Sequence, residues 1–183
     1  MSATVDKVLD AAEGAMRARG YHAVSFRELA DDIGIKSSSV HYHFPQKDDL
    51  GVALIERYSK RVLAELNRRS EESKNPNDRL DAFIDVYREA LVNTDSVCLC
   101  VMLGAESRGL PDNVSNAVAD FFDANIGWLA NILPTTLSKK ARRNKAASVL
   151  ATLQGAMMMA ATLKDTGLFD AIVKELRAAH RQS

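Results

Sequence analysis

The fold is decided by residues 24–50, which read VSFRELADDIGIKSSSVHYHFPQKDDL. Ser25 and Glu28 have the spacing of a capping box, in which the hydroxyl and the carboxylate each accept a hydrogen bond from an orphan backbone amide. A helix is therefore expected to begin after Ser25. It should end at Gly34, because glycine readily takes the left-handed backbone conformation found at helix ends.

A second, shorter helix should follow this turn. Ser37 or Ser38 is expected to cap it, Val40 and Phe44 lie four residues apart on its inner face, and Pro45 closes it. Two short helices joined by a tight turn, the second only about two turns long, form a helix-turn-helix unit.

Outside this stretch, apolar residues recur every three or four positions, as in amphipathic helices. One helix should precede the unit and end near Gly20, and a long helix should run from Lys47 to about Glu72. Further helices are expected after Pro76, at residues 97–107, between Asp112 and Pro134, after Ser138 and after Gly167. No convincing strand is found, so the sequence predicts an all-α protein of about nine helices.

These motifs closely resemble the DNA-binding segment of TetR/AcrR-type transcriptional regulators. The shared features are a capping Ser before the second helix, a Leu-Ala pair, the Gly-aliphatic turn, an aromatic-rich recognition helix and Phe-Pro-x-Lys before a long fourth helix. Two positions depart from the family pattern, because His41 stands where Tyr is usual and Lys36 stands where a small Ser or Thr cap is usual.

The resemblance implies a helix-turn-helix DNA-binding domain at residues 1–50 and a helical effector-binding and dimerisation domain at residues 51–183. A recognition helix must be polar toward the groove and thin enough for its backbone to approach the bases, and residues 36–39 meet this need. The predicted DNA-binding residues are Ser25, Arg27, Lys36, Ser37, Ser38, Ser39, His41, Tyr42, His43 and Lys47. Of these, the resemblance places Ser25, Arg27, Tyr42, His43 and Lys47 near phosphates or base edges.

Charge and composition restrict the partners. The chain has 24 basic and 24 acidic residues, so no overall field attracts DNA or a membrane. Residues 1–50 contain six basic and eight acidic residues, and non-specific DNA binding should therefore be weak. Residues 146–163 are uncharged but rich in Ala and polar residues, which indicates a buried helix and not a membrane span. With no apolar run near the N-terminus, we expect a cytoplasmic protein.

The uncharged helix needs cover on two sides, and a second copy of the chain is the economical partner. Small residues permit close approach there, and the last helix adds an apolar stripe, so a twofold four-helix interface is expected. The predicted interface residues are Ala147, Ala151, Gly155, Phe169, Ile172 and Leu176. Two recognition helices would then enter successive major grooves about 34–36 Å apart, and the DNA operator should be an inverted repeat.

A small effector is expected among the middle helices, where aromatic and thioether side chains suit a mostly apolar, adaptable cavity. The predicted ligand-binding residues are Phe83, Tyr87, Met102, Glu106, Phe121, Phe122, Asn125, Trp128, Gln154 and Met158. Such an effector would release a homodimeric repressor from double-stranded DNA, provided that it prefers one conformation of the dimer. No cofactor or metal is expected.

Two alternatives remain open. Cys98 and Cys100 are either buried structural thiols or an oxidant or electrophile sensor; their spacing on a helix suits neither a disulfide nor one shared metal. The second alternative is an all-α ligand-binding or interaction module without DNA recognition, which the departures from the family pattern at Lys36 and His41 permit. Enzymatic activity is not expected, because no nucleophile, phosphate-loop or metal-ligand motif is found, and His180 lies in a tail that should fray.

Overall fold

The computed structural model describes residues 3–73, 75–94 and 97–181, which form nine helices and no strand. The helices are α1 (Ala3–Arg19), α2 (Phe26–Asp32), α3 (Ser37–His43), α4 (Lys47–Ser70), α5 (Pro76–Thr94), α6 (Leu99–Ala105), α7 (Asp112–Ile132), α8 (Lys139–Leu163) and α9 (Thr166–Arg181). The all-α prediction is confirmed. The main difference is α6, which is shorter than the helix expected at residues 97–107.

The helices pack into two compact units. The first unit contains Met1–Ser59 and Leu99–Phe121, and the second contains Lys60–Cys98 and Phe122–Ser183. Helices α4 and α7 each begin in the first unit and end in the second. The units are defined by packing, whereas the division predicted at residue 50 concerns function and stays a prediction.

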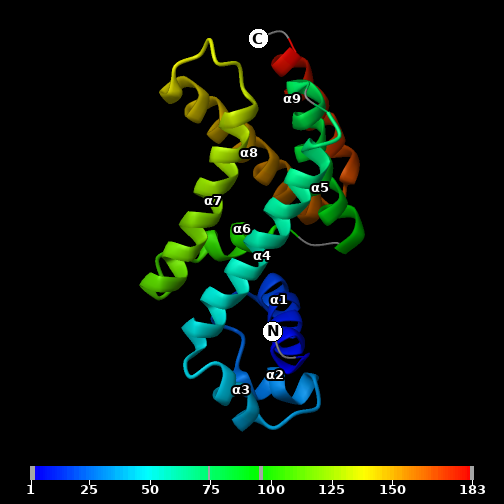
Figure 1. Ribbon diagram of the computed structural model, residues 1–183. Helices are drawn as coiled ribbons and strands as arrows, with labels where there is room; N and C mark the ends of the chain where they lie inside the picture. Colours follow the sequence, from blue (N-terminus) through cyan, green and yellow to red (C-terminus); the bar gives the residue numbers. More distant parts are fainter. Residues whose placement is uncertain (1–2, 74, 95–96, 182–183) are drawn as a thin grey trace. The chain divides into compact units, whose positions relative to one another are not determined.

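In the first unit, α2 packs against both α1 and α3, and α6 packs against α1 (Figure 1). Polar contacts add to this packing, because Arg57 of α4 donates to Asp10 of α1 at 2.8 Å, and Arg17 of α1 donates to the Tyr58 hydroxyl at 3.4 Å. The fully buried side chains of this unit include Leu9, Met16, Leu29, Val40, Leu50 and Leu54. The predicted apolar faces of these helices therefore form the core.

The ends of the short helices follow the sequence signals with one exception. The capping box is present, since the Ser25 hydroxyl accepts from the Glu28 amide and Glu28 accepts from the Ser25 amide, both at 3.2 Å. Gly20 and Gly34 have φ of 81° and 69°, the left-handed conformation expected for them. The predicted serine cap of α3 is wrong, because Lys36 occupies the N-cap position and no side chain caps the helix.

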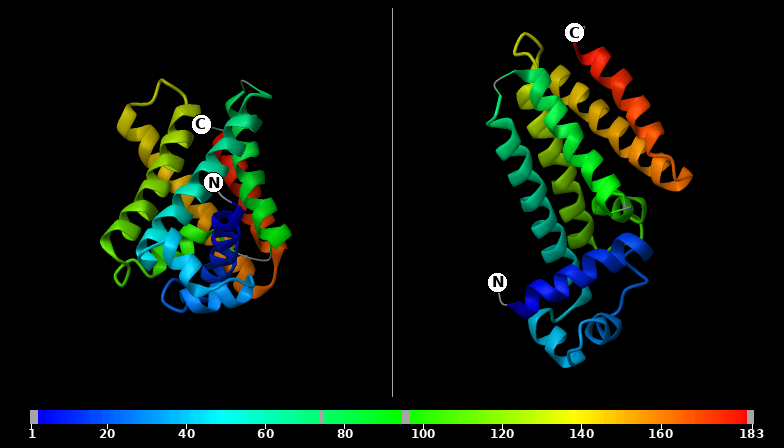
Figure 2. Two further views of the ribbon diagram at one scale, coloured as in Figure 1. Left: turned by 60° about the horizontal axis from the view of Figure 1, so that its bottom comes forward. Right: turned by 90° about the vertical axis from the view of Figure 1, so that its right-hand side faces the viewer.

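In the second unit, α8 and α9 lie side by side and α5 packs against both (Figure 2). The core contains one buried polar pair, because the Tyr87 hydroxyl donates to Asn125 Oδ1 at 3.0 Å. The apolar residues buried in this unit include Leu80, Ile84, Leu91, Leu129, Leu153, Phe169 and Val173.

Helix α8 is covered by its own chain on one face only. Residues such as Val149, Leu153 and Met157 are buried, whereas Met158 and Leu163 are exposed. The expectation of a buried helix is therefore met only in part by its own chain. Of the described helices, α8 alone has the length and composition to cross a membrane, but core helices of soluble proteins pass the same test, and 44% of its most apolar segment is buried.

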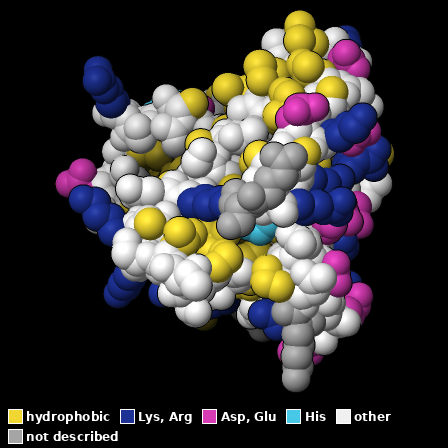
Figure 3. All heavy atoms as spheres, turned by 90° about the horizontal axis from the view of Figure 1, so that it is seen from above, with side chains coloured by type: hydrophobic (Ala, Val, Ile, Leu, Met, Phe, Trp, Pro, Cys, Tyr) yellow, Lys and Arg dark blue, Asp and Glu magenta, His cyan; other side chains and the backbone are white. Residues whose placement is uncertain are grey.

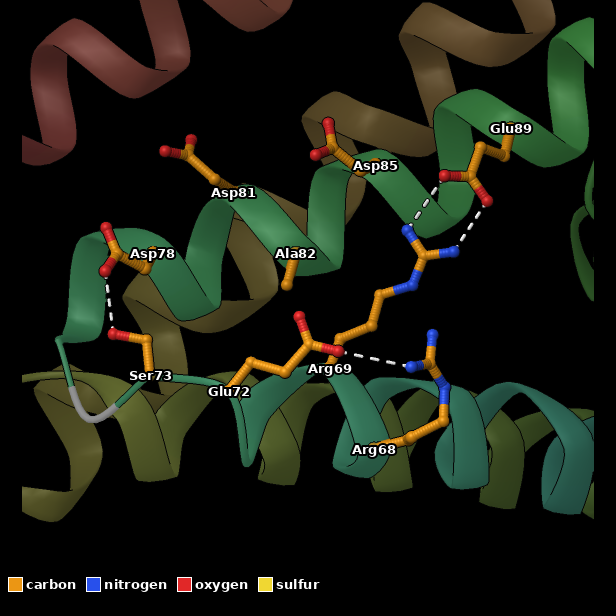
Figure 4. A pocket seen from close by; sticks show the side chains of 9 residues that line it. All are labelled: Arg68, Arg69, Glu72, Ser73, Asp78, Asp81, Ala82, Asp85 and Glu89. Carbon is orange, nitrogen blue, oxygen red and sulfur yellow. Dashed lines mark hydrogen bonds and ion pairs between the residues drawn. The ribbon is translucent and has the colours of Figure 1, made fainter.

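Ion pairs connect the helices at the surface of the second unit. Arg69 of α4 donates to Glu65 on its own helix at 2.6 Å. It also donates to both carboxylate oxygens of Glu89 on α5, at 2.6 and 2.9 Å (Figure 4). These bonds lie in an open groove of about 390 Å³ lined almost entirely by charged residues. Basic and acidic side chains also lie next to one another on the face shown in Figure 3. Hydrogen bonds to Arg68 and Arg69 lower the pKa of Glu65 to about 2.

His180 does not lie in a frayed tail, contrary to the expectation. It belongs to α9 and is half-buried, and its Nδ1 is buried without a hydrogen-bond partner in the described part of the chain. Burial lowers the pKa of His180, the charge of Lys145 lowers it further, and Asp81 acts in the opposite direction. The folded protein therefore favours the neutral imidazole.

This environment predicts a pH dependence of stability. Because the pKa of His180 is lower in the folded protein than its ordinary value of about 6.5, its contribution to stability is complete above that pH and is lost as the pH falls through the folded pKa. The free energy of unfolding, measured with urea from neutral pH downward, should fall less steeply in His180→Gln than in the wild type. His22→Gln controls for the loss of a histidine in the other unit, and parallel curves for His180→Gln and the wild type would contradict the prediction.

Candidate nucleic-acid interface

The turn between α2 and α3 is held by backbone and apolar contacts. The amide of Ile35 donates to the carbonyl of Ala30 at 2.9 Å, which closes the turn after Gly34. Val40 and Phe44 are buried beneath α3. With this inner face fixed, the other side of α3 is available to a ligand.

The available side of α3 is polar and carries one large ring. The side chains of Lys36, Ser38, His41 and Tyr42 are exposed, and those of Ser37, Ser39 and His43 are half-buried. Tyr42 is 82% exposed, and the edge of its ring contacts His43 at a centroid distance of 5.1 Å. An aromatic ring so far exposed has no role in the core of this chain and is suited to a contact outside it.

A groove of about 310 Å³ lies beside this surface. Its lining residues are Thr4, Ile35, Ser38, Ser39, Tyr42 and His43. The sequence analysis missed Thr4, which comes from the first turn of α1 and is brought there by tertiary packing. No spacing signal in the sequence connects Thr4 to α3.

The predicted residues in α2 and α3 have different local roles. His41 is exposed but also contacts Phe26 edge to face, with the ring centroids 4.7 Å apart, and thus supports the α2–α3 packing. The Ser25 hydroxyl accepts the capping hydrogen bond of α2. Arg27 is exposed on α2.

Lys47 is held at the start of α4 by the turn between α1 and α2. Its Nζ donates to the carbonyl of His22 at 3.3 Å and lies 4.6 Å from the centre of the Tyr21 ring. Burial lowers the pKa of Lys47, although the carboxylates of Glu106 and Glu28 raise it. Burial and the charge of Asp48 raise the pKa of Tyr21 to about 12, so its phenol is neutral beside the ammonium group.

The predicted ligand-binding residues fall in both units. Met102, Glu106 and Phe121 belong to the first unit, where Phe121 contacts the Tyr58 ring and Glu106 accepts a hydrogen bond from the Tyr21 amide. Met158 lies on the exposed face of α8. The residues within the second unit are Phe83, Tyr87, Phe122, Asn125, Trp128 and Gln154. Sequence position alone did not reveal that Glu106 accepts a hydrogen bond within the first unit.

Part of this second group forms an aromatic cluster. The Phe83 ring lies 5.0 Å from Tyr87 and 5.5 Å from Trp128 between centroids, and Trp128 Nε1 donates to Asn67 Oδ1 at 2.8 Å. Gln154 is 7% exposed, and neither its amide oxygen nor its amide nitrogen has a hydrogen-bond partner among the described residues. A buried amide without partners is unfavourable.

The remaining predicted residues lie as follows. Ala151 is exposed and Ala147 and Gly155 are half-buried on α8, while Ile172 and Leu176 are half-buried on α9. Phe169 is fully buried inside its own chain. Cys98 and Cys100 are buried, and no disulfide joins them. Across the described ranges, no group of three or more His, Cys, Asp or Glu side chains is placed to hold a metal ion.

A short polar helix held by a capped partner helix across a glycine turn is the arrangement of a helix-turn-helix DNA-binding protein. Residues 8–54 match the family model described as bacterial regulatory proteins, tetR family, and residues 76–175 match that of the LmrA/YxaF-like transcriptional regulator C-terminal domain. The chain belongs to the TetR family of transcriptional regulators, and its helix-turn-helix is the DNA-binding domain of that family.

Individual relatives agree with this assignment. The uncharacterized HTH-type transcriptional regulator YxaF of Bacillus subtilis is 26% identical over 94 residues, which span 50% of this chain and about half (49%) of that protein. A TetR transcriptional regulator from Legionella pneumophila has a similar structure, with a TM-score of 0.89 and 28% identity over 100% of this chain and 97% of the other. A TetR family regulator from Agrobacterium tumefaciens has a TM-score of 0.89 and 26% identity over 96% of each chain.

The exposure of Tyr42 generates a prediction for DNA binding. Tyr42→Ala should weaken binding to a DNA duplex selected from a random pool by about 10-fold or more, because one side-chain contact to DNA contributes about 1–3 kcal/mol. The melting temperature should not change, since an exposed side chain contributes little to folding. Fluorescence anisotropy and circular dichroism measure the two quantities.

Tyr42→Phe is the matched control, because it keeps the ring and removes only the hydroxyl. Loss of affinity in both variants assigns the contact to the hydroxyl, and loss in Tyr42→Ala alone assigns it to the ring. Wild-type affinity in Tyr42→Ala would show that the ring does not touch DNA.

Proposed function

We propose that the protein is a cytoplasmic homodimeric repressor that binds an inverted-repeat DNA operator and is released from it by a small, mostly apolar effector. In this proposal, residues 1–50 bind the operator, and residues 51–183 provide the dimer interface and the effector site. The observation that carries the proposal is the exposed apolar face of α8, which a second copy of the chain would cover.

The exposed face of α8 has the composition of a helix-helix interface. Ala151, Gly155 and Met158 follow one another at helical spacing, and Met158, Met159 and Leu163 are 50%, 44% and 64% exposed. Small residues permit close approach of a second helix, and the larger apolar residues gain from burial. Met158 is therefore assigned to the interface and not to the effector site.

Helix α9 would extend this interface. It packs along α8, and Ile172 and Leu176 are half-buried on it, so both retain surface that a partner can cover. Phe169 offers no surface, because it is fully buried in its own chain, and it is left out of the proposed interface. Paired α8 and α9 helices from two chains would form a four-helix interface with twofold symmetry.

Sedimentation velocity tests the dimer. The wild type should sediment as a dimer at micromolar concentration, and Met158→Lys should raise the dimer dissociation constant by about 100-fold or more, because twofold symmetry places both new charges in one apolar interface. Val92→Lys is the matched control, since Val92 is an exposed apolar residue (49%) on α5 and not on α8. A monomeric wild type, or equal effects of the two substitutions, would contradict the proposed interface.

The twofold axis also supports the form of the operator. Two recognition helices related by such an axis read the same half-site in opposite orientation, about 34–36 Å apart. Selection from random duplexes should then return an inverted repeat. If none is recovered, the alternative of a ligand-binding or interaction module without DNA recognition is favoured. Repression is proposed because the resemblance to the family implies that the bound protein blocks a promoter.

The aromatic cluster and Gln154 support an effector site in the second unit. Phe83, Tyr87 and Trp128 give an apolar, polarisable surface, and Gln154 brings an NH2 donor group and a carbonyl acceptor that the described residues leave unpaired. An effector with a small polar group complementary to an amide would use both. Binding sites for small molecules commonly combine apolar walls with a few such polar groups.

A substitution at Gln154 separates stability from effector binding. Gln154→Leu replaces the amide by a slightly smaller apolar side chain and removes both unpaired atoms, so it should raise the free energy of unfolding by about 1–3 kcal/mol. The same variant should weaken effector binding, which Trp128, as the only tryptophan, reports by its fluorescence. Asn144→Leu on the exposed side of α8 controls for added apolar volume. A less stable Gln154→Leu would show that the amide is satisfied in the folded protein.

The thiol-sensor alternative has less support, because both Cys98 and Cys100 are buried and a reagent must reach the thiolate. A specific experiment distinguishes it from the effector proposal. Hypochlorite or a maleimide is added to the complex of DNA with the variant that combines Cys98→Ser and Cys100→Ser. If the thiols have no sensory role, this variant should still release the DNA.

A further inference from the structure

The carboxylate of Glu106, at the C-terminal end of α6, is bonded to the turn between α1 and α2. Its Oε2 accepts a hydrogen bond from the backbone amide of Tyr21 at 3.0 Å. Gly20 has φ of 81°, and a Cβ at this position would overlap Glu106 Oε1. The backbone conformation thus favours glycine at position 20, and a Cβ there would displace the Glu106 carboxylate from its present position.

The same turn holds the ammonium group of Lys47. Lys47 Nζ donates to the carbonyl of His22 and lies over the Tyr21 ring. The Tyr21 and His22 rings also contact each other edge to face, with 5.3 Å between centroids. Tyr21 therefore donates its amide to the Glu106 carboxylate, and its ring contacts the Lys47 ammonium group. This one residue connects the two charged groups.

The start of α7 contacts the first turns of α4 in the same unit. Asn113 Nδ2 donates to Asp48 Oδ2 at 2.9 Å. A Cβ on Gly51 would lie 3.1 Å from Val114 Cγ2, so the two helices approach closely there. Gly109 is similarly close to His22, since its Cβ would lie 3.2 Å from Nε2. The residues that follow α6 thus hold both the α1–α2 turn and the beginning of α4.

We propose that Glu106 is a positioning residue for DNA binding: through the Tyr21 amide it fixes the α1–α2 turn, and this turn holds Lys47 where its remaining N–H groups meet a DNA phosphate. The inference rests on the proposed role of Lys47 as a phosphate contact. Glu106 itself touches no DNA in this arrangement.

The sign of the effect distinguishes positioning from simple electrostatics. Glu106 is negative and belongs to the unit that binds DNA, so removal of its charge would by electrostatics alone strengthen DNA binding. Positioning predicts the reverse, because Tyr21 would lose the acceptor of its amide and Lys47 would lose its fixed support. Glu56, an exposed carboxylate of α4 in the same unit, provides the electrostatic control.

The experiment measures DNA affinity by anisotropy over a range of salt concentrations for the full chain. The variants are Glu106→Ala, Glu106→Gln, Glu56→Ala, Lys47→Ala and the double variant of Glu106→Ala with Lys47→Ala. The probes are a duplex selected from a random pool and a scrambled duplex at low salt. The scrambled duplex is sufficient to measure the contribution of Lys47 to DNA affinity, because phosphate contacts do not depend on the base sequence. If selection finds no site, the proposed operator fails while the positioning of Lys47 is still measured.

Glu106→Ala should weaken binding about 10-fold, as expected for loss of a charge-assisted hydrogen bond. The slope of log affinity against log salt should become shallower by about 0.9, which is what one neutralised phosphate contributes. Glu106→Gln, which still accepts from the Tyr21 amide, should bind nearly as the wild type. In the Lys47→Ala background, Glu106→Ala should have little further effect.

Three results would overturn the proposal. The first is that Glu106→Ala binds DNA as well as Glu56→Ala does. The second is that Glu106→Ala weakens DNA binding equally in the wild type and in the Lys47→Ala background. The third is that Glu106→Ala leaves the slope of log affinity against log salt unchanged. Circular dichroism establishes that each variant is folded. If Glu106→Ala is unfolded, Glu106→Asp, which keeps the charge but is one methylene shorter, is judged by the same criteria.

Discussion

The α3 helix of seven residues is too short to be stable by itself, since isolated helices below about 12 residues are marginal in water. Its geometry depends on the burial of Val40 and Phe44 beneath it. No side chain caps its N-terminus, so packing has to supply what a cap would otherwise contribute. The other elements of the first unit form the support that keeps the exposed face of this helix in place.

Local signals made the helix-turn-helix predictable from the sequence. The capping box of Ser25 and Glu28 and the glycine turn at Gly34 act within a few residues, and their geometry is as expected. The serine cap of α3 was predicted wrongly because a serine is favourable at the N-cap, but the chain enters the helix one residue earlier, at Lys36. Local preference was overridden there by the position of the turn.

Contacts between distant parts of the chain were not predictable in the same way. Glu106 looked like a polar group for an effector, yet its partner is the amide of Tyr21, 85 residues away. Helical spacing states which face of a helix is apolar but not which element covers it. The same limit applies to Thr4 beside α3 and to His180, whose half-buried place on α9 depends on neighbouring helices. For α8, the sequence predicted a need for cover, and its own chain provides this on one side only.

The first unit is discontinuous along the chain, because it combines residues 1–59 with α6 and the start of α7. The units are joined covalently through α4, through the bond between Cys98 and Leu99, and through α7. At two of these connections an unbroken helix runs from one unit into the other. The third connection leads into α6, whose far end is followed by Glu106. Lys47, the first residue of α4, is held by the α1–α2 turn, and Glu106, which follows α6, holds that turn. A displacement of α4 or of α6 would therefore reach the α1–α2 turn. A ligand can use these connections only if its affinity differs between two positions of the helices, and the free energy available for regulation is limited to that difference.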